Sequence, residues 1–70
     1  MSYYLIAVYW PGQGYGGADR LNSIKDADAA IARHVKLGYG SKRCPIHIIK
    51  RTDDEVVRVE DSQPDKMEKL

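Results

Sequence analysis

The longest apolar run in the chain extends from Tyr3 to Trp10 and combines aromatic with aliphatic side chains. Together with the Pro11-Gly12 pair that follows it, this composition predicts a β-strand over Ser2–Trp10. Successive side chains of a strand point to opposite faces, so the strand presents two sets of residues. One face would carry Tyr4, Ile6, Val8 and Trp10, and the other Tyr3, Leu5, Ala7 and Tyr9. Because both sets are apolar, this strand needs a cover on each face.

A chain of 70 residues has little material with which to provide that cover. It is long enough for one domain, and a monomer of this size hides only about 60% of the surface that its unfolded chain exposes. The run Tyr3–Trp10 is also far shorter than the roughly 20 apolar residues that cross a bilayer, and it lacks the features of a signal peptide. We therefore expect a small cytoplasmic domain that gains stability by association.

One helix is predicted in the middle of the chain. Ser23-Ile-Lys-Asp26 has the pattern of a capping box with Asp in place of Glu, which makes Ser23 the expected N-cap. Apolar residues then recur at helical spacing, at Ile24, Ala27, Ile31 and His34/Val35. The helix should end at Leu37, because Gly38 can adopt the left-handed conformation that closes a helix and Tyr39 can fold over the last turn.

Two more strands are predicted beyond the helix, over Cys44–Arg51 and Val56–Glu60, with a polar turn at residues 52–55 between them. Residues 62–70 lack apolar content and are expected to form a flexible tail. The predicted architecture is a single β-α-β-β domain over residues 1–61, of the α/β (α+β) class, whose three-stranded sheet carries the helix on one face. A right-handed crossover would make its first two strands parallel.

The sheet face without the helix is the predicted dimer face. A single helix covers one face, and an exposed patch this aromatic indicates an interaction surface. The alternative cover is the glycine-rich segment or the tail, folded back over the sheet. We expect a homodimer, either face to face or edge to edge. The expected dimer residues are Tyr3, Leu5, Ala7, Tyr9 and Ile49, and the alternative face carries Tyr4, Ile6, Val8 and Trp10.

The segment from Pro11 to Asn22 is predicted to be a long connection rich in glycine. Its stretch Gly12-Gln-Gly-Tyr-Gly-Gly17 matches G-x-G-x-x-G, in which glycine N–H groups and a helix N-terminus cradle a phosphate. The helix cap at Ser23 lies several residues further on, so a plain flexible loop is the alternative. With parallel strands, this loop would meet basic strand-end residues at one edge of the sheet. The candidate ligand-binding residues are Gly12, Gly14, Tyr15, Gly16, Gly17, Arg20, Lys50 and Arg51.

Tyr15 is the residue of that loop best suited to contact a binding partner, because an aromatic side chain on a loop can stack on a base or dock into a protein. The tripeptide Gly38-Tyr-Gly40 repeats Gly14-Tyr-Gly16. With the helix between them, we expect the two tripeptides at opposite ends of the subunit, where they cannot share a pocket within one chain but could meet in a dimer.

No motif predicts catalytic or metal chemistry. Cys44 is the single cysteine, so the chain has no internal disulfide. Positions 44 and 47 differ by an odd number, which places Cys44 and His47 on opposite faces of a regular strand and argues against a catalytic dyad. The two residues are also only half of a structural zinc site. We therefore predict no catalytic residue, no metal site and no cofactor.

These features predict a small non-enzymatic binding module, homodimeric and acting on a protein partner. The alternative is a nucleotide or other small phosphorylated ligand bound through the Gly12–Gly17 loop and the strand-end basic residues. Weak nucleic-acid binding comes third, because a net charge of +1 is unlike the basic surface of a dedicated nucleic-acid binder. No membrane partner is expected, and no motif is specific enough to identify a family.

Overall fold

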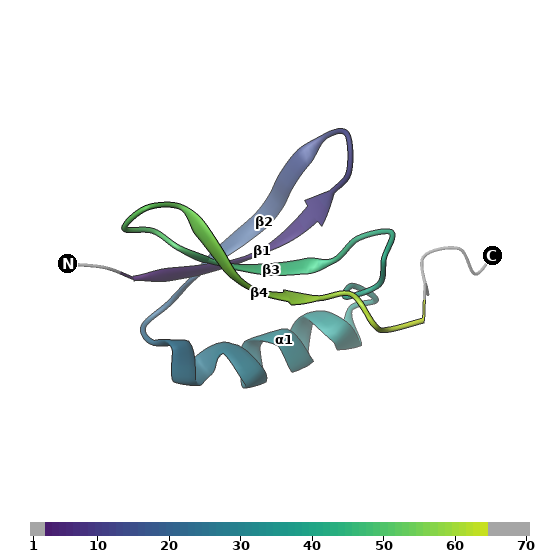
Figure 1. Ribbon diagram of the computed structural model, residues 1–70. Coiled ribbons are helices and arrows are strands. Elements are labelled where there is room, and N and C mark those ends of the chain that lie inside the picture. The colour runs from purple at the N-terminus through teal and green to yellow at the C-terminus, as the bar shows by residue number, and fades with distance from the viewer. Residues whose placement is uncertain (1–2, 65–70) are drawn as a thin grey trace.

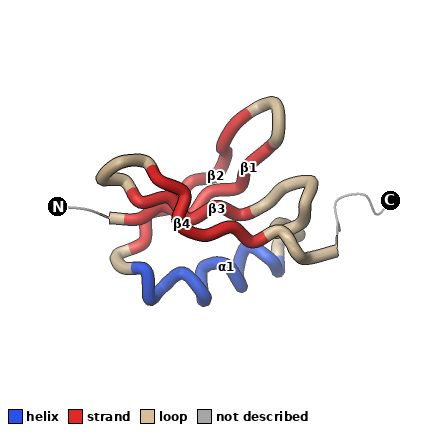
Figure 2. Tube along the Cα trace, viewed as in Figure 1, coloured by secondary structure: helices blue, strands red, loops and turns tan. Residues whose placement is uncertain are grey.

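The computed structural model describes residues 3–64 as one helix packed on one face of a four-stranded sheet (Figure 1). The elements in chain order are β1 (Tyr4–Trp10), β2 (Gly14–Leu21), a 3-10 turn (Ile24–Asp26), α1 (Ala27–Lys36), β3 (Ile46–Lys50) and β4 (Glu55–Glu60). Figure 2 shows the strands as one layer and the helix as a second. The predicted small α+β class is confirmed, whereas the prediction of three strands is wrong.

Strand β1 lies inside the sheet, whose order is β2-β1-β3-β4 with every neighbouring pair antiparallel. Its backbone is therefore hydrogen-bonded on both edges. The pairing with the β3 side extends beyond both strands, because the N–H of Tyr9 donates to the carbonyl of Pro45 at 2.8 Å and the N–H of Arg51 donates to that of Tyr3 at 2.9 Å. This interior position leaves neither edge of β1 unpaired within the described part of the chain.

The additional strand is β2, in the segment predicted to be a loop. The hairpin closes where the N–H of Gln13 donates to the carbonyl of Trp10 at 2.8 Å, with Gly12 at φ 85° and Gly14 at φ 106°. Glycine weakens a strand on its own, but here the segment pairs with the strongest strand-former in the chain. The register shifts between Ile6 and Val8, and Gly17, at φ 62°, accommodates the bulge there.

The predicted parallel pairing of the strands on either side of the helix is also wrong. Strand β2 returns the chain to the Tyr4 end of the sheet before the helix starts, so β3 runs antiparallel to β1, with Leu5 opposite Ile49 and Ala7 opposite His47. The additional strand β2 thus reverses the direction of α1 and of the strands after it, relative to the predicted arrangement. The right-handed crossover of a βαβ unit does not apply to this topology.

The helix ends where the sequence predicts. Gly38 has φ 101°, its N–H donates to the carbonyl of Val35 at 3.0 Å, and the N–H of Tyr39 donates to that of His34 at 3.2 Å. These two bonds form a Schellman motif. At the other end Ser23 is the N-cap of the opening 3-10 turn, whereas Asp26 is the N-cap of α1 itself. The predicted capping box is wrong, because the Ser23 side chain makes no capping hydrogen bond.

The core lies between α1 and the sheet. Its buried members are Ile6, Leu21, Ala27, Ala30, Ile31, Ile46 and Ile48. Each fully buried isoleucine is worth about 1.5–3 kcal/mol relative to an exposed one. Ile24, predicted on the apolar helix face, is 44% exposed instead, because it belongs to the 3-10 turn, where the 3.6-residue period does not hold.

The chain after β4 returns to the α1–β3 connection. The N–H of Gln63 donates to the carbonyl of Gly40 at 3.0 Å, and the hydroxyl of Ser62 donates to the carboxylate of Glu60 at 2.6 Å. The first residues of the predicted tail thus make contacts, and residues 65–70 lie outside the described part of the chain. No helix within residues 3–64 has the length and apolar character needed to cross a membrane.

Candidate functional site

The sheet face opposite α1 carries no helix (Figure 1), and we call it the open face. Directly paired residues of an antiparallel sheet lie on the same face, so the register defines its members. They are Tyr3, Leu5, Ala7, Tyr9, Tyr15, Arg20, His47, Ile49, Val56 and Val59. The predicted dimer residues all lie there, and their role in a dimer stays a prediction.

Three rings form a cluster at one end of the open face. The Tyr9 ring stacks on His47 with centroids 5.0 Å apart, and the Tyr15 ring lies 5.2 Å from Tyr9 and 5.3 Å from His47. The Tyr15 hydroxyl and Nδ1 of His47 are 2.7 Å apart. In the tautomer with its proton on Nε2, His47 accepts this hydrogen bond from Tyr15. The hydroxyl and the ring nitrogen thus satisfy each other.

Burial affects the ionisation of both partners. It lowers the pKa of His47, with Asp61 acting in the opposite direction. It also raises the pKa of Tyr15, to which Tyr9 adds. Loss of hydration disfavours the imidazolium and the phenolate alike. The Tyr15–His47 pair is therefore uncharged at neutral pH.

Long side chains cover part of the open face. The Arg20 guanidinium lies 4.2 Å from the Tyr3 ring centroid, a cation–π contact that covers one corner. Ala7 and Ile49 are buried, at 0% and 8% exposure, although no helix lies over them. The glycine-rich segment thus contributes Tyr15 and Arg20 as a partial cover. It does so as an edge strand and not as a loop folded over the sheet.

The β4 side of the open face remains apolar and exposed. Val56 and Val59 are 39% and 48% exposed. They are three positions apart, so a regular strand would place them on opposite faces. The register shift between Ile48 and Ile49 puts both on the open face, Val56 beside Ile49 and Val59 beside His47. These valines were not among the predicted dimer residues, because a bulge leaves no clear signal in the sequence of a single strand.

The predicted ligand-binding residues do not gather at one place. Gly14 pairs with Trp10 at one end of β1, whereas Lys50 pairs with Tyr4 at the other end, about 20 Å away along the strand. Arg51 forms an ion pair with Asp54 at 3.3 Å. The glycines of residues 12–17 were expected to lie close to Lys50 and Arg51 because the strands were predicted to be parallel. The antiparallel sheet places the two groups at opposite ends of β1.

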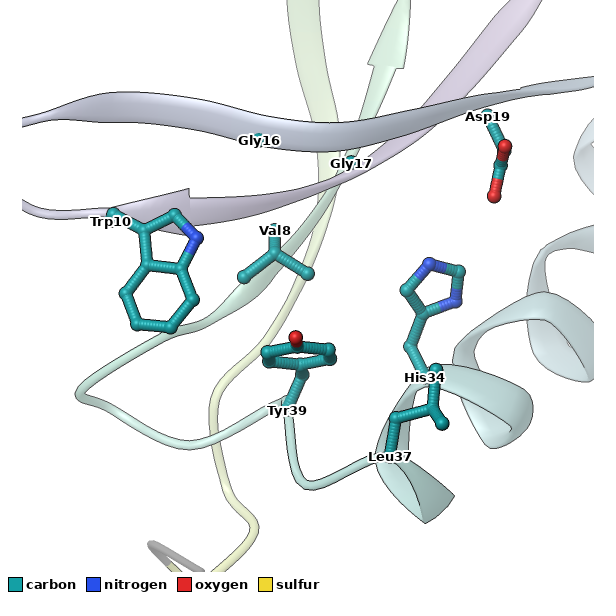
Figure 3. A pocket seen from close by; sticks show the side chains of 8 residues that line it. All are labelled: Val8, Trp10, Gly16, Gly17, Asp19, His34, Leu37 and Tyr39. Carbon is teal, nitrogen blue, oxygen red and sulfur yellow. The ribbon is translucent and has the colours of Figure 1, made fainter. Parts of the chain in front are cut away.

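A pocket of about 320 Å³ lies on the helix side of the sheet, between the β1–β2 hairpin and the end of α1 (Figure 3). Its lining residues are Val8, Trp10, Gly16, Gly17, Asp19, His34, Leu37 and Tyr39. Gly16 and Tyr39 belong to the two glycine–tyrosine–glycine tripeptides, so the prediction that these tripeptides lie at opposite ends of the subunit is wrong. Strand β2 takes the chain to the Tyr4 end of the sheet, and α1 then runs back, so that the end of α1 lies beside the first tripeptide.

Comparison with known proteins gives no match to this chain among family models, curated proteins or solved structures. Residues 3–64 contain no group of three or more His, Cys, Asp or Glu side chains placed to hold a metal ion.

Proposed function

We propose that this chain is a small non-enzymatic binding module that acts by protein–protein association, and that it forms a homodimer through the open face. The observation that carries this proposal is the exposed apolar surface of Val56, Val59 and Tyr15, over which no other described element lies. Surfaces of this kind on small domains are usually interaction sites.

The electrostatics of the open face favour a second copy as the partner. Leu5, Tyr9 and Val59 are uncharged, and the Tyr15–His47 pair is neutral at pH 7. The charged member of the open face is Arg20, which lies over the Tyr3 ring at one corner, so the central part of two such faces can meet without repulsion. The Tyr15 hydroxyl and Nδ1 of His47 already bond each other, which reduces the cost of removing these two atoms from water. A twofold axis would then pair the same patch with itself.

The size of the open face indicates a weak, reversible dimer. Four strands spaced about 4.8 Å apart and a β1 of seven residues give a face of about 400 Å². Two copies would bury about 800 Å², which is below the roughly 1,200 Å² of stable interfaces. A protein partner with an apolar sheet face would compete for the same surface, so dimerisation and partner binding would exclude each other.

Sedimentation measured as a function of concentration tests the dimer. Between about 10 and 500 µM, the range suited to weak affinities, we expect the mass to rise from one chain to two. Val59→Glu should weaken the dimer by more than about tenfold, because it would bury an unpaired carboxylate.

Leu37→Glu is the matched control, because Leu37 is exposed at the end of α1 on the other side of the sheet. This variant should dimerise like the wild type. A wild-type chain that sediments as a monomer across the whole range while melting cooperatively would exclude the proposed dimer.

A further inference from the structure

We propose that the pocket between the β1–β2 hairpin and the end of α1 binds an organic cation, namely a protonated amine or guanidinium group carried by an apolar body. The pocket lies on the helix side of the sheet, opposite the open face. The proposal is therefore independent of the proposed dimer.

Two aromatic side chains form the wall at one end of the pocket. The Trp10 and Tyr39 rings meet edge to face, with centroids 6.0 Å apart and an interplanar angle of 88°. Rings at a right angle form a corner, and the electron-rich ring faces of tryptophan and tyrosine attract cations. Val8 and Leu37 add aliphatic surface beside them. This wall suits the apolar body of a ligand as well as its positive charge.

The polar side of the pocket carries a carboxylate. Asp19 pairs with Ile6 in the sheet register, which places its side chain on the helix side. In Figure 3 the Asp19 carboxyl group points from β2 toward the His34 ring. The Asp19 side chain forms no ion pair or hydrogen bond within residues 3–64. A negative charge without a partner thus borders an aromatic corner.

His34 adds a second acceptor. Its side chain is buried, and Nδ1–H donates to the carbonyl of Ala30 at 2.9 Å. In the neutral ring this bond leaves Nε2 as an unprotonated acceptor. A ligand facing Asp19 and His34 therefore has to present hydrogen-bond donors, and the Asp19 charge favours a cation over a phosphate or carboxylate.

Glycine keeps the β2 side of the pocket open. Gly16 and Gly17 line it without side chains, and a Cβ built at Gly16 would lie 3.5 Å from Nε1 of Trp10. A larger side chain at this position would enter the space beside the indole. The volume of about 320 Å³ is at the lower end of the range for small-molecule sites.

The test uses three probes of one shape and different charge: 2-phenylethylammonium, 2-phenylethanol and phenylacetate. Trp10 is the single tryptophan of the chain, so its fluorescence reports directly on the pocket. We expect saturable binding of the ammonium probe, binding of the alcohol about fivefold weaker, and no binding of phenylacetate, as the contributions of cation–π contacts and exposed ion pairs predict.

Variants assign the preference to the pocket. Asp19→Asn should lower the affinity for the ammonium probe toward that for the alcohol, leaving only the cation–π part of the preference. Asp53→Asn, with the same charge change in the β3–β4 turn, should leave the affinity unchanged. Gly16→Val should abolish binding of both probes, and the thermal melts of all variants should confirm that they are folded. Equal binding of the three probes, no saturable response, or an equal effect of the two Asn substitutions would each overturn the proposal.

Discussion

At the scale of single residues, His47 lies on an open sheet face and is nevertheless kept neutral by its neighbours. Tyr9 stacks on its ring, and Tyr15 donates a hydrogen bond to it. The resulting loss of hydration lowers its pKa, against the opposing effect of Asp61. The same contacts that cover this part of the open face thus determine the charge at its surface.

The lowered pKa predicts a loss of stability on acidification. The unfolded chain takes up a proton at His47 as the pH falls through about 6.5, whereas the folded protein takes it up only at lower pH. Proton uptake therefore favours the unfolded state between those two values, and this contribution to stability is fully present above pH 6.5. Thermal melts from pH 7.5 to 4.5 should show a steeper decrease for the wild type than for His47→Gln. Parallel curves for the two proteins would contradict the prediction.

At the scale of elements, the connection between α1 and β3 is held by several hydrogen bonds and buried side chains. The N–H of Gly40 donates to the carbonyl of Cys44 at 3.0 Å, and its carbonyl accepts from Gln63. The Ser41 hydroxyl lies 3.5 Å from Sγ of Cys44, and both residues are buried. This connection holds the end of α1 and the chain after β4 against each other.

Gly40→Ala should destabilise the protein by more than about 1 kcal/mol, because alanine is strained at positive φ. Gly40 has φ 94°, and an added Cβ would lie 3.2–3.3 Å from side-chain atoms of Val35, Glu60 and Gln63. Gly16→Ala is the matched control, since its Cβ would meet Trp10 at an ordinary 3.5 Å and no positive φ is involved. Urea unfolding of both variants checks this, and equal midpoints would show that Gly40 is not constrained.

At the scale of the whole molecule, one thin sheet separates two different surfaces. The open face is broad and apolar, whereas the pocket on the helix side combines aromatic rings with a carboxylate. Strand β1 contributes to both, with Tyr9 on the open face and Trp10 in the pocket. A chain of 70 residues thus carries two candidate binding surfaces that share a single strand.

The two surfaces should operate independently. Val59→Glu should leave the affinity for 2-phenylethylammonium unchanged, and Asp19→Asn should leave the dimer unchanged, because residues without shared contacts usually contribute additively. Fluorescence titration and sedimentation of both variants measure this. A change of more than about threefold in the ligand affinity of Val59→Glu, or in the dimer affinity of Asp19→Asn, would reveal coupling through β1.

Local patterns in the sequence determined several elements of this protein. The doubly apolar run predicted β1 and its need for two covers, and Gly38 predicted the end of the helix. The polar turn at residues 52–55 and the apolar runs on either side of it predicted β3 and β4, whereas the regular alternation of the second run is broken by the bulge. Each of these features depends on residues close together in the chain, where side-chain periodicity and backbone freedom act directly.

Only the tertiary structure decided how these elements combine. Glycine-rich β2 is a strand because β1 offers it a partner, and that pairing alone reverses the direction of β3. The same pairing brings Gly16 and Asp19 to the end of α1 and so creates the pocket, while the bulge in β4 places Val56 and Val59 on one face. Strand pairing joins residues that are distant in the chain, and a local sequence pattern does not determine which strands will pair.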